Sequence, residues 1–178
     1  MTIQSTVPLD TLDNGLEVVG GKGRSLSRLL NAGYNVPGGF QVPTSAYRAF
    51  VAENNLQSNI LALAKPAIVN GTVSFEQASE DIAQLFRDHA LSTEMHTEIS
   101  AAYDALSGAS AVAVRSSANA EDLPELSFAG QQETYLNVTG GEEVAAAVKN
   151  CWASLWTSQA ISYRHENDID HASVAMAV

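Results

Sequence analysis

The segment that most constrains how this chain can fold runs from Ala111 to Val138 and reads AVAVRSSANAEDLPELSFAGQQETYLNV. At its start, valines alternate with small or charged residues, and near its end Thr134 and Tyr135 begin a second run of β-formers. Both patterns predict strands. The connection between them is roughly fifteen residues long, and loops of that length in a compact domain are usually binding loops or lids, or else disordered.

The end of the first predicted strand carries Arg115, which Ser116 and Ser117 follow directly. A planar, permanently charged guanidinium beside two hydroxyl groups suits a phosphate group. The same residues also fit a β-hairpin whose arginine pairs with Glu121 or Asp122, because ion pairs of that kind are common and weak. The residue types alone therefore leave a phosphate site and a solvated hairpin both open.

A second candidate for anion binding is the glycine-rich segment GGKG at residues 20–23. Its glycines let the backbone approach a ligand, the helix that follows supplies N–H groups, and Lys22 adds a positive charge. The segment is not a Walker P-loop, because Gly21 occupies the lysine position and no Ser or Thr follows Lys22 directly. A plain glycine-rich turn remains the alternative.

The order of residues in both segments resembles one known family. The stretch VRSSANAEDLPELSFAGQQETYLNV is similar to a signature of the nucleotide-binding domain shared by phosphoenolpyruvate synthase, rifampin phosphotransferase and, more distantly, pyruvate phosphate dikinase. The segment GGKG, with AGYNVPGGFQVPTSAY after it, resembles the opening of the same domain. Asn119 stands where the family usually has Thr, which we expect to tune the loop. The likeness extends from Gly20 to Val178.

The resemblance implies an α+β chain, spanning residues 1–178, that forms the first part of an ATP-grasp fold. In that fold two subdomains clamp the nucleotide between antiparallel sheets. The loop from Ala118 to Ala129 is then expected to be a lid that is mobile without nucleotide. Carried over by position, the ATP-binding residues are Lys22, Arg115, Gly130 and Thr134, with Ser116, Ser117 and Gln132 as weaker candidates.

The resemblance also implies a function. In such enzymes ATP phosphorylates a mobile histidine, which carries the phosphoryl group to an acceptor. Pyruvate is the favoured acceptor here, and a rifampin-modifying enzyme or a non-catalytic nucleotide-binding module are the alternatives. The domain in this family continues past Val178, so we expect the catalytic histidine, the Mg²⁺ ligands and the acceptor-binding residues to lie outside this chain. The chain by itself is expected to be inactive.

Composition limits the partners. The chain has 178 residues, of which 46% are apolar and 16% charged, so it can bury a core. Its net charge of -11 argues against nucleic acid or an anionic membrane surface as a partner, since both require a positive field. One cysteine, Cys151, excludes an internal disulfide, and no export signal or long apolar run is present. The expected location is the cytoplasm.

Apolar periodicity and turn residues predict the remaining elements. Leu16 to Val19 favours a short strand, and Gly33 marks the end of the helix that follows the glycine-rich segment. Thr44 is the predicted N-cap of the next helix, and Ser74 with Gln77 forms the predicted capping box of a later one. We also expect an edge strand at 36–42, helices at 56–64, 95–106, 139–155 and 160–164, a turn at 70–71 and a strand at 173–178.

The cysteine and the histidines are interpreted mainly as structural. Cys151 lies among apolar residues of a predicted helix face, so we expect packing and not nucleophilic chemistry. His89 and His96 are expected to be surface or packing residues. His165 and His171 have carboxylates nearby and suggest a metal site, but the irregular segment between them makes that the weaker interpretation.

Overall fold

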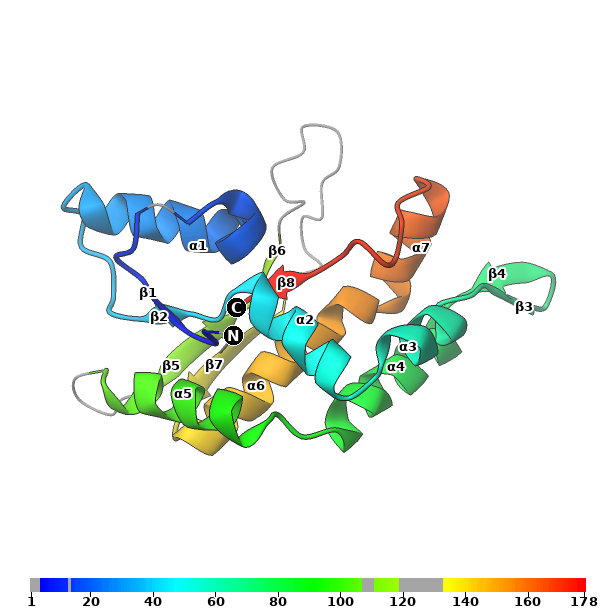
Figure 1. Ribbon diagram of the computed structural model, residues 1–178. Helices are drawn as coiled ribbons and strands as arrows, with labels where there is room; N and C mark the ends of the chain where they lie inside the picture. The colour runs from blue at the N-terminus through cyan, green and yellow to red at the C-terminus, as the bar shows by residue number, and fades with distance from the viewer. Residues whose placement is uncertain (1–3, 13, 107–110, 119–132) are drawn as a thin grey trace.

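The computed structural model describes residues 4–12, 14–106, 111–118 and 133–178 (Figure 1). Helices surround one hydrophobic core, and short antiparallel strand pairs join them, which confirms the predicted α+β class. The helices are α1 (Leu16–Asn31), α2 (Thr44–Glu53), α3 (Gln57–Leu63), α4 (Glu76–Asp88), α5 (Thr93–Asp104), α6 (Gly141–Ala153) and α7 (Ser158–Glu166). A 3-10 turn, Ser154–Trp156, follows α6.

Every strand pair is antiparallel and two-stranded in the described part of the chain. The pairs are β1 (Val7–Pro8) with β2 (Phe40–Gln41), β3 (Ala67–Val69) with β4 (Thr72–Ser74), β5 (Val112–Arg115) with β7 (Thr134–Val138), and β6 (Ser117–Ala118) with β8 (Met176–Ala177). The two strands predicted at the ends of the central segment are therefore confirmed, and they pair with each other. The strands predicted at 36–42 and 173–178 are present but shorter.

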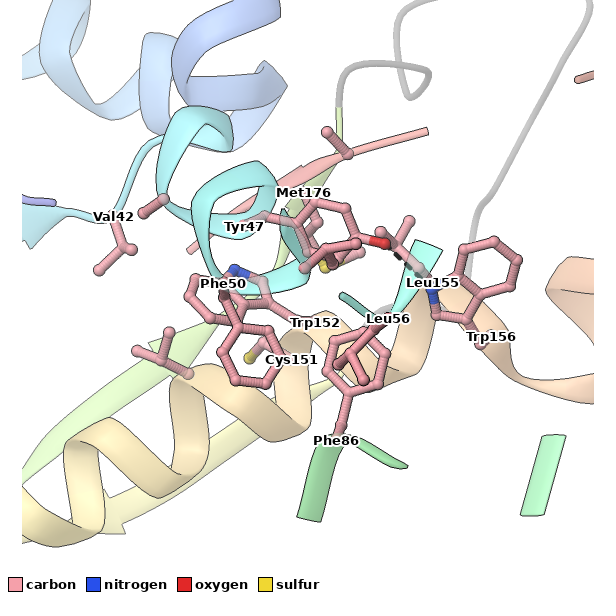
Figure 2. Packing of buried hydrophobic residues seen from close by; sticks show 14 of the residues in the cluster. Val42, Tyr47, Phe50, Leu56, Phe86, Cys151, Trp152, Leu155, Trp156 and Met176 are labelled. Atoms are coloured by element: carbon pink, nitrogen blue, oxygen red, sulfur yellow. Dashed lines mark hydrogen bonds between the residues drawn. The ribbon is translucent and has the colours of Figure 1, made fainter. Parts of the chain in front are cut away.

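The core is built on α6, which lies between the β5–β7 pair and the helices α2 and α4 (Figure 1). Trp152 of α6 is fully buried, and its ring centroid lies 5.4 Å from that of Phe50 in α2. Phe50 in turn contacts Phe86 of α4, with ring centroids 5.5 Å apart. Figure 2 shows these rings packed together, with the indole N–H of Trp156 donating a hydrogen bond of 3.1 Å to the Tyr47 hydroxyl. Burial of these large rings supplies much of the driving force for folding.

The predicted inward faces of the helices agree with this core. Cys151 is fully buried, and burial raises its pKa to about 12, so the thiol stays neutral and has the packing role expected of it. Leu85, Ala102 and Leu106 are only half-buried. The predicted core residues that the structure buries are Tyr47, Phe50, Val51, Phe75, Ala78, Ile82, Phe86, Met95, Ile99, Tyr103, Val144, Ala147, Val148, Cys151, Trp152 and Leu155.

The strand predicted at Leu16 to Val19 is wrong, because these residues form the first turn of α1. The backbone N–H groups of Val18 and Val19 both donate to the carbonyl of Gly15, at 3.0 and 3.2 Å. Gly20 then interrupts the helix with φ 69° and ψ 177°, a conformation that favours glycine. The predicted stop at Gly33 is confirmed: its φ is 82°, and its N–H donates to the carbonyl of Leu30 at 3.0 Å.

Both predicted caps are displaced by one residue. Pro43 occupies the N-cap position of α2, and the hydroxyl of Thr44 donates to the carbonyl of Glu17 at 2.7 Å, tying α2 to α1. Phe75 occupies the N-cap position of α4. The amide of Gln77 donates to Asp81 at 2.9 Å, one turn further along the helix, and so does not complete a capping box.

The turn predicted at 70–71 is confirmed and connects a hairpin that the sequence did not reveal. Asn70 and Gly71 have φ values of 51° and 79°, as a two-residue hairpin turn requires. The strands β3 and β4 project from the helices in Figure 1, and Ile68 on β3 is 70% exposed. Strands this short contain too few residues for an alternating pattern to be detected.

Candidate phosphate-binding site

The two segments proposed for anion binding lie against each other, although more than ninety residues separate them. The ammonium group of Lys22 donates to the carbonyl of Ser116 at 3.2 Å. The backbone N–H of Gly23 donates to the hydroxyl of Ser117 at 3.1 Å. Because Ser116 directly follows Arg115, these contacts bring the lysine to the end of the strand that carries the arginine (Figure 1).

Gly20 makes this close approach possible. A β-carbon on Gly20 would overlap the carbonyl oxygen of Ser117, and the positive φ would strain any other residue. The glycine-rich segment therefore packs directly against the backbone of β6. The close approach that Gly20 allows is therefore toward the protein's own strand, and the predicted approach of these glycines to a ligand remains a prediction.

Arg115 and Thr134 are cross-strand partners in the β5–β7 pair. Both residues are exposed, and cross-strand partners place their side chains on the same face of a sheet. A guanidinium and a hydroxyl are thus available together at the end of β5. Among the described residues, no hydrogen bond or ion pair of Arg115 is found.

Ser116 and Ser117 are placed differently from what the sequence suggested. Both are buried, with 0% and 3% of their surfaces exposed. The Ser116 hydroxyl donates to the carbonyl of Glu133 at 3.2 Å, and the Ser117 hydroxyl donates to the carbonyl of Val19 at 2.8 Å. Both hydroxyl groups thus form hydrogen bonds with backbone carbonyls around the site. Ala118, the first residue of the predicted lid, is buried and pairs with Met176 of β8. The rest of the predicted lid, and the predicted residues Gly130 and Gln132, lie outside the described residues.

Polar contacts around Ser27 join the middle of α1 to β2. The Ser27 hydroxyl donates to the carbonyl of Gly23 at 3.1 Å and accepts from the amide of Gln41 at 2.9 Å. Ser27 and Gln41 are both buried, at 3% exposure each. These contacts join α1 to β2, and sequence reasoning missed them because no local pattern pairs a helix serine with a glutamine on a distant strand.

Tyr135, next to Thr134 on β7, is neutral at physiological pH. Burial, followed by the nearby Glu133 carboxylate, raises the pKa of Tyr135 to about 12. Glu133 is exposed and directly precedes Thr134, the first residue of β7. Lys22 and Arg115 therefore supply the positive charge of the site against an acidic background, since the chain carries a net charge of -11.

The histidines do not assemble a metal site in the described part of the chain. No group of three or more His, Cys, Asp and Glu side chains converges there. The Nδ1 atom of His171 accepts a hydrogen bond of 3.0 Å from Nε of Arg164, and the ring of His165 packs against Phe75, with centroids 5.5 Å apart. The described residues thus provide no fit for the Mg²⁺ ion that the resemblance implies.

Arg164 is a buried cation with an unusual set of neighbours. It is 1% exposed, its guanidinium carbon lies 4.9 Å from the centre of the Trp156 ring, and burial lowers its pKa to about 10. Its contact with His171 requires an unprotonated Nδ1 on that imidazole. Burial, followed by the charge of Arg164 and of His165, lowers the pKa of His171, against a weaker opposite effect of Asp170.

This arrangement predicts a loss of stability at acid pH. Because the pKa of His171 is lower in the folded state, its contribution is complete above the unfolded pKa, roughly 6.5, and is lost as the pH falls through the folded value. Urea unfolding at pH 7.5 and pH 5.5 measures the effect. We expect His171→Gln, which still offers Arg164 an acceptor oxygen, to lose less stability than the natural chain over this interval. An equal loss in the natural chain and His171→Gln would contradict the assignment.

A separate hollow of about 450 Å³ lies where β1 and β2 approach the ends of α1 and α5. Its described lining includes the apolar residues Leu9, Leu30, Leu106 and Val112. Asp10 is the charged residue of that described lining. Lys22, Arg115, Ser116, Ser117 and Thr134, the predicted phosphate-binding residues that the structure describes, do not line it. An acidic, partly apolar hollow does not suit a phosphate group, so the hollow is not part of the candidate site.

The family and the relatives that this chain matches agree with each other. Residues 16–178 match the family described as "Pyruvate phosphate dikinase, AMP/ATP-binding domain". A phosphoenolpyruvate synthase from Aeropyrum pernix is 47% identical over 169 residues, which cover 92% of this chain and 21% of the relative. A probable phosphoenolpyruvate synthase from Methanocaldococcus jannaschii is 43% identical over 95% of this chain and 15% of the relative.

A third relative, the phosphoenolpyruvate synthase from Synechocystis sp., is 43% identical over 94% of this chain and 22% of its own length. The chain therefore spans about a fifth of the length of the curated relatives it matches. The matches agree with the nucleotide-binding architecture predicted from the sequence. In the described part of the chain, no helix is both long and apolar enough to cross a bilayer.

Proposed function

Because the chain belongs to the pyruvate phosphate dikinase AMP/ATP-binding domain family, we propose that it is the ATP-binding part of a longer phosphotransferase. ATP phosphorylates a histidine on a separate domain, and that histidine passes the phosphoryl group to pyruvate. The observation that carries the proposal is the contact of Lys22 with Ser116, which brings two cations, Lys22 and Arg115, to one strand end. Phosphoryl transfer depends mainly on such positioning and charge neutralisation.

The roles of the residues follow from their chemistry. Lys22 and Arg115 bind phosphate oxygens, and Arg115 can do so with two parallel hydrogen bonds. Thr134, beside Arg115, offers a hydroxyl to the same ligand. Gly130 and Gln132 complete the site in this proposal, with the backbone of Gly130 next to the nucleotide. Local cations are needed because the chain as a whole, at -11, repels ATP.

The rest of the reaction belongs to the remainder of the longer protein. We assign the phosphoacceptor histidine, the Mg²⁺ ligands and the pyruvate site to residues outside this chain, in keeping with its share of about a fifth of its relatives. Mg²⁺ would supply charge neutralisation at the phosphates. The names of the relatives favour pyruvate as acceptor over a rifampin hydroxyl. A cytoplasmic location, without nucleic-acid or membrane partners, fits a metabolic role and an acidic surface.

The test uses the longer protein and ATP labelled with ³²P in its β- and γ-phosphates. We expect an acid-labile, base-stable label on the protein, as a phosphohistidine gives, and its transfer to pyruvate on addition. Absence of protein labelling would contradict the phosphotransferase proposal. Transfer to rifampin and not to pyruvate would replace the proposed acceptor with the drug.

The isolated 178-residue chain should bind Mg-ATP weakly and transfer no phosphoryl group. Two cationic contacts act against a net charge of -11, and the described residues hold no metal-binding group. A single subdomain also leaves most of the adenine in water, whereas ligand pockets normally bury ~70% or more of a ligand. We expect at best millimolar affinity, about -4 kcal/mol, by titration calorimetry. Micromolar binding would instead favour an independent nucleotide-binding module.

A further inference from the structure

We propose that Ser117 is a positioning residue for Lys22: its hydroxyl caps, from a distant strand, the helical segment that begins after Gly20. The inference rests on the proposed function, because Lys22 matters here as a phosphate ligand. It assigns to Ser117 a role other than direct contact with ATP.

The break at Gly20 creates a new helix start inside α1. Gly20 has φ 69° and ψ 177°, so helical geometry resumes at Gly21. The first N–H groups of a helical segment have no partner within it, and an N-cap side chain usually accepts one of them. Gly20 stands at the N-cap position and has no side chain. The hydroxyl of Ser117 accepts from the N–H of Gly23, at 3.1 Å, where a local cap would.

The same hydroxyl also holds the chain on the other side of the break. It donates to the carbonyl of Val19 at 2.8 Å. Val19 precedes Gly20, and Gly23 follows Lys22, so one side chain joins both ends of the segment that contains the lysine. Ser117 is 3% exposed and Val19 is 1% exposed. Hydrogen bonds at a site shielded from water hold their geometry more firmly than exposed ones.

The position of Ser117 in the chain links the two cations. Ser117 lies two residues after Arg115 and begins β6, which pairs with β8 at Ala177. The main-chain carbonyl of Ser116 accepts from Lys22 at 3.2 Å. Lys22 is thus held against the residues that directly follow Arg115. A polyphosphate that binds both charges gains affinity when Lys22 is already held in place, because less ordering is needed on binding.

The structure also argues against Ser117 as a direct ligand. Its proton is directed to Val19, one lone pair accepts from Gly23, and the residue is buried. A direct phosphate contact would require these bonds to break. Ser27 offers a matched comparison, because it is buried to the same 3%, lies on the same helix and also makes two hydrogen bonds, neither of which spans Lys22.

The experiment is a calorimetric titration of the longer protein with Mg²⁺ and a non-hydrolysable ATP analogue, which measures the dissociation constant of the natural protein and of each variant. We expect Ser117→Ala to raise the dissociation constant about tenfold, which corresponds to about 1.4 kcal/mol. Ser117→Thr, which keeps the hydroxyl, should stay within about threefold of the natural chain. Ser27→Ala should do the same, because the Ser27 hydroxyl bonds the Gly23 carbonyl and the Gln41 amide and its loss leaves the bonds of Ser117 to Val19 and to the Gly23 N–H in place.

The outcomes separate the two proposals. If the natural longer protein does not bind the ATP analogue, the proposed function fails and this inference with it. If the natural protein binds it and Ser117→Ala binds equally well, the positioning role is wrong while the ATP site stands. If Ser27→Ala weakens binding as much as Ser117→Ala, the effect is general loosening of α1, and the specific role of Ser117 is overturned. Thermal unfolding of each variant shows that the compared chains are folded.

Discussion

Lys22→Ala and Arg115→Ala should each reduce ATP-dependent histidine phosphorylation in the longer protein by about 10- to 150-fold, while the fold remains intact. Loss of a charge-assisted hydrogen bond to a phosphate typically costs about 1.5 to 3 kcal/mol. The loss is greater where the charge on the phosphate changes in the transition state. Both residues lie at the surface of the site and outside the buried core, so the substitutions leave the packing around Trp152 unchanged.

The measurement is the initial rate of protein labelling from ³²P-ATP, with circular dichroism to confirm folding. Arg28→Ala is the matched control, because Arg28 is an exposed cation on the same helix as Lys22 but lies in its last turn. Its labelling rate should match that of the natural protein. Near-normal rates for both Lys22→Ala and Arg115→Ala would show that the phosphate site lies elsewhere.

Trp152→Ala should destabilise the chain by about 3 to 5 kcal/mol, the usual range for truncating a buried Trp or Phe. Trp152 is fully buried, and its ring lies 5.4 Å from Phe50 and 6.0 Å from Tyr47, measured between ring centroids (Figure 2). Because domains of this size are stable by about 5 to 15 kcal/mol in total, this one change removes a large share.

Trp152→Phe distinguishes the effect of the cavity on stability from the effect of the indole N–H group. The indole N–H of Trp152 is buried and has no hydrogen-bond partner among the described residues, so replacing it with Phe removes this donor while leaving a smaller cavity than Ala does. Urea unfolding followed by circular dichroism measures both variants. We expect Phe to cost clearly less than Ala. A cost below about 1 kcal/mol for Trp152→Ala would mean that α6 is not the centre of the core.

The parts of the fold that the sequence predicted are those with long apolar periodicity. The face of α6 that carries Val148, Cys151 and Trp152 repeats over several turns, and so does the face of α4 that carries Ile82 and Phe86. The first turn of α1 was missed because Leu16 to Val19 is too short for the helical and extended periods to be distinguished, and the glycines after it weaken any helix prediction.

For the candidate site, the sequence predicted the two cations but not the hydrogen bonds that support them. Lys22 and Arg115 were assigned because the residues around them resemble a known signature. The hydrogen bond from Gly23 to the hydroxyl of Ser117 joins residues 94 positions apart, and no local pattern indicates such a pair. Ser117 was therefore a weak ligand candidate in the sequence, whereas its burial and hydrogen bonds indicate a supporting role.

The most direct test of the account is a crystal structure of the longer protein with Mg²⁺ and a non-hydrolysable ATP analogue. We expect phosphate oxygens of the analogue within about 3.2 Å of both the Lys22 ammonium and the Arg115 guanidinium, the range of a hydrogen bond. The Ser117 hydroxyl should still bond Val19 and Gly23. A triphosphate bound away from both cations, with Lys22 still donating to the carbonyl of Ser116, would contradict the account.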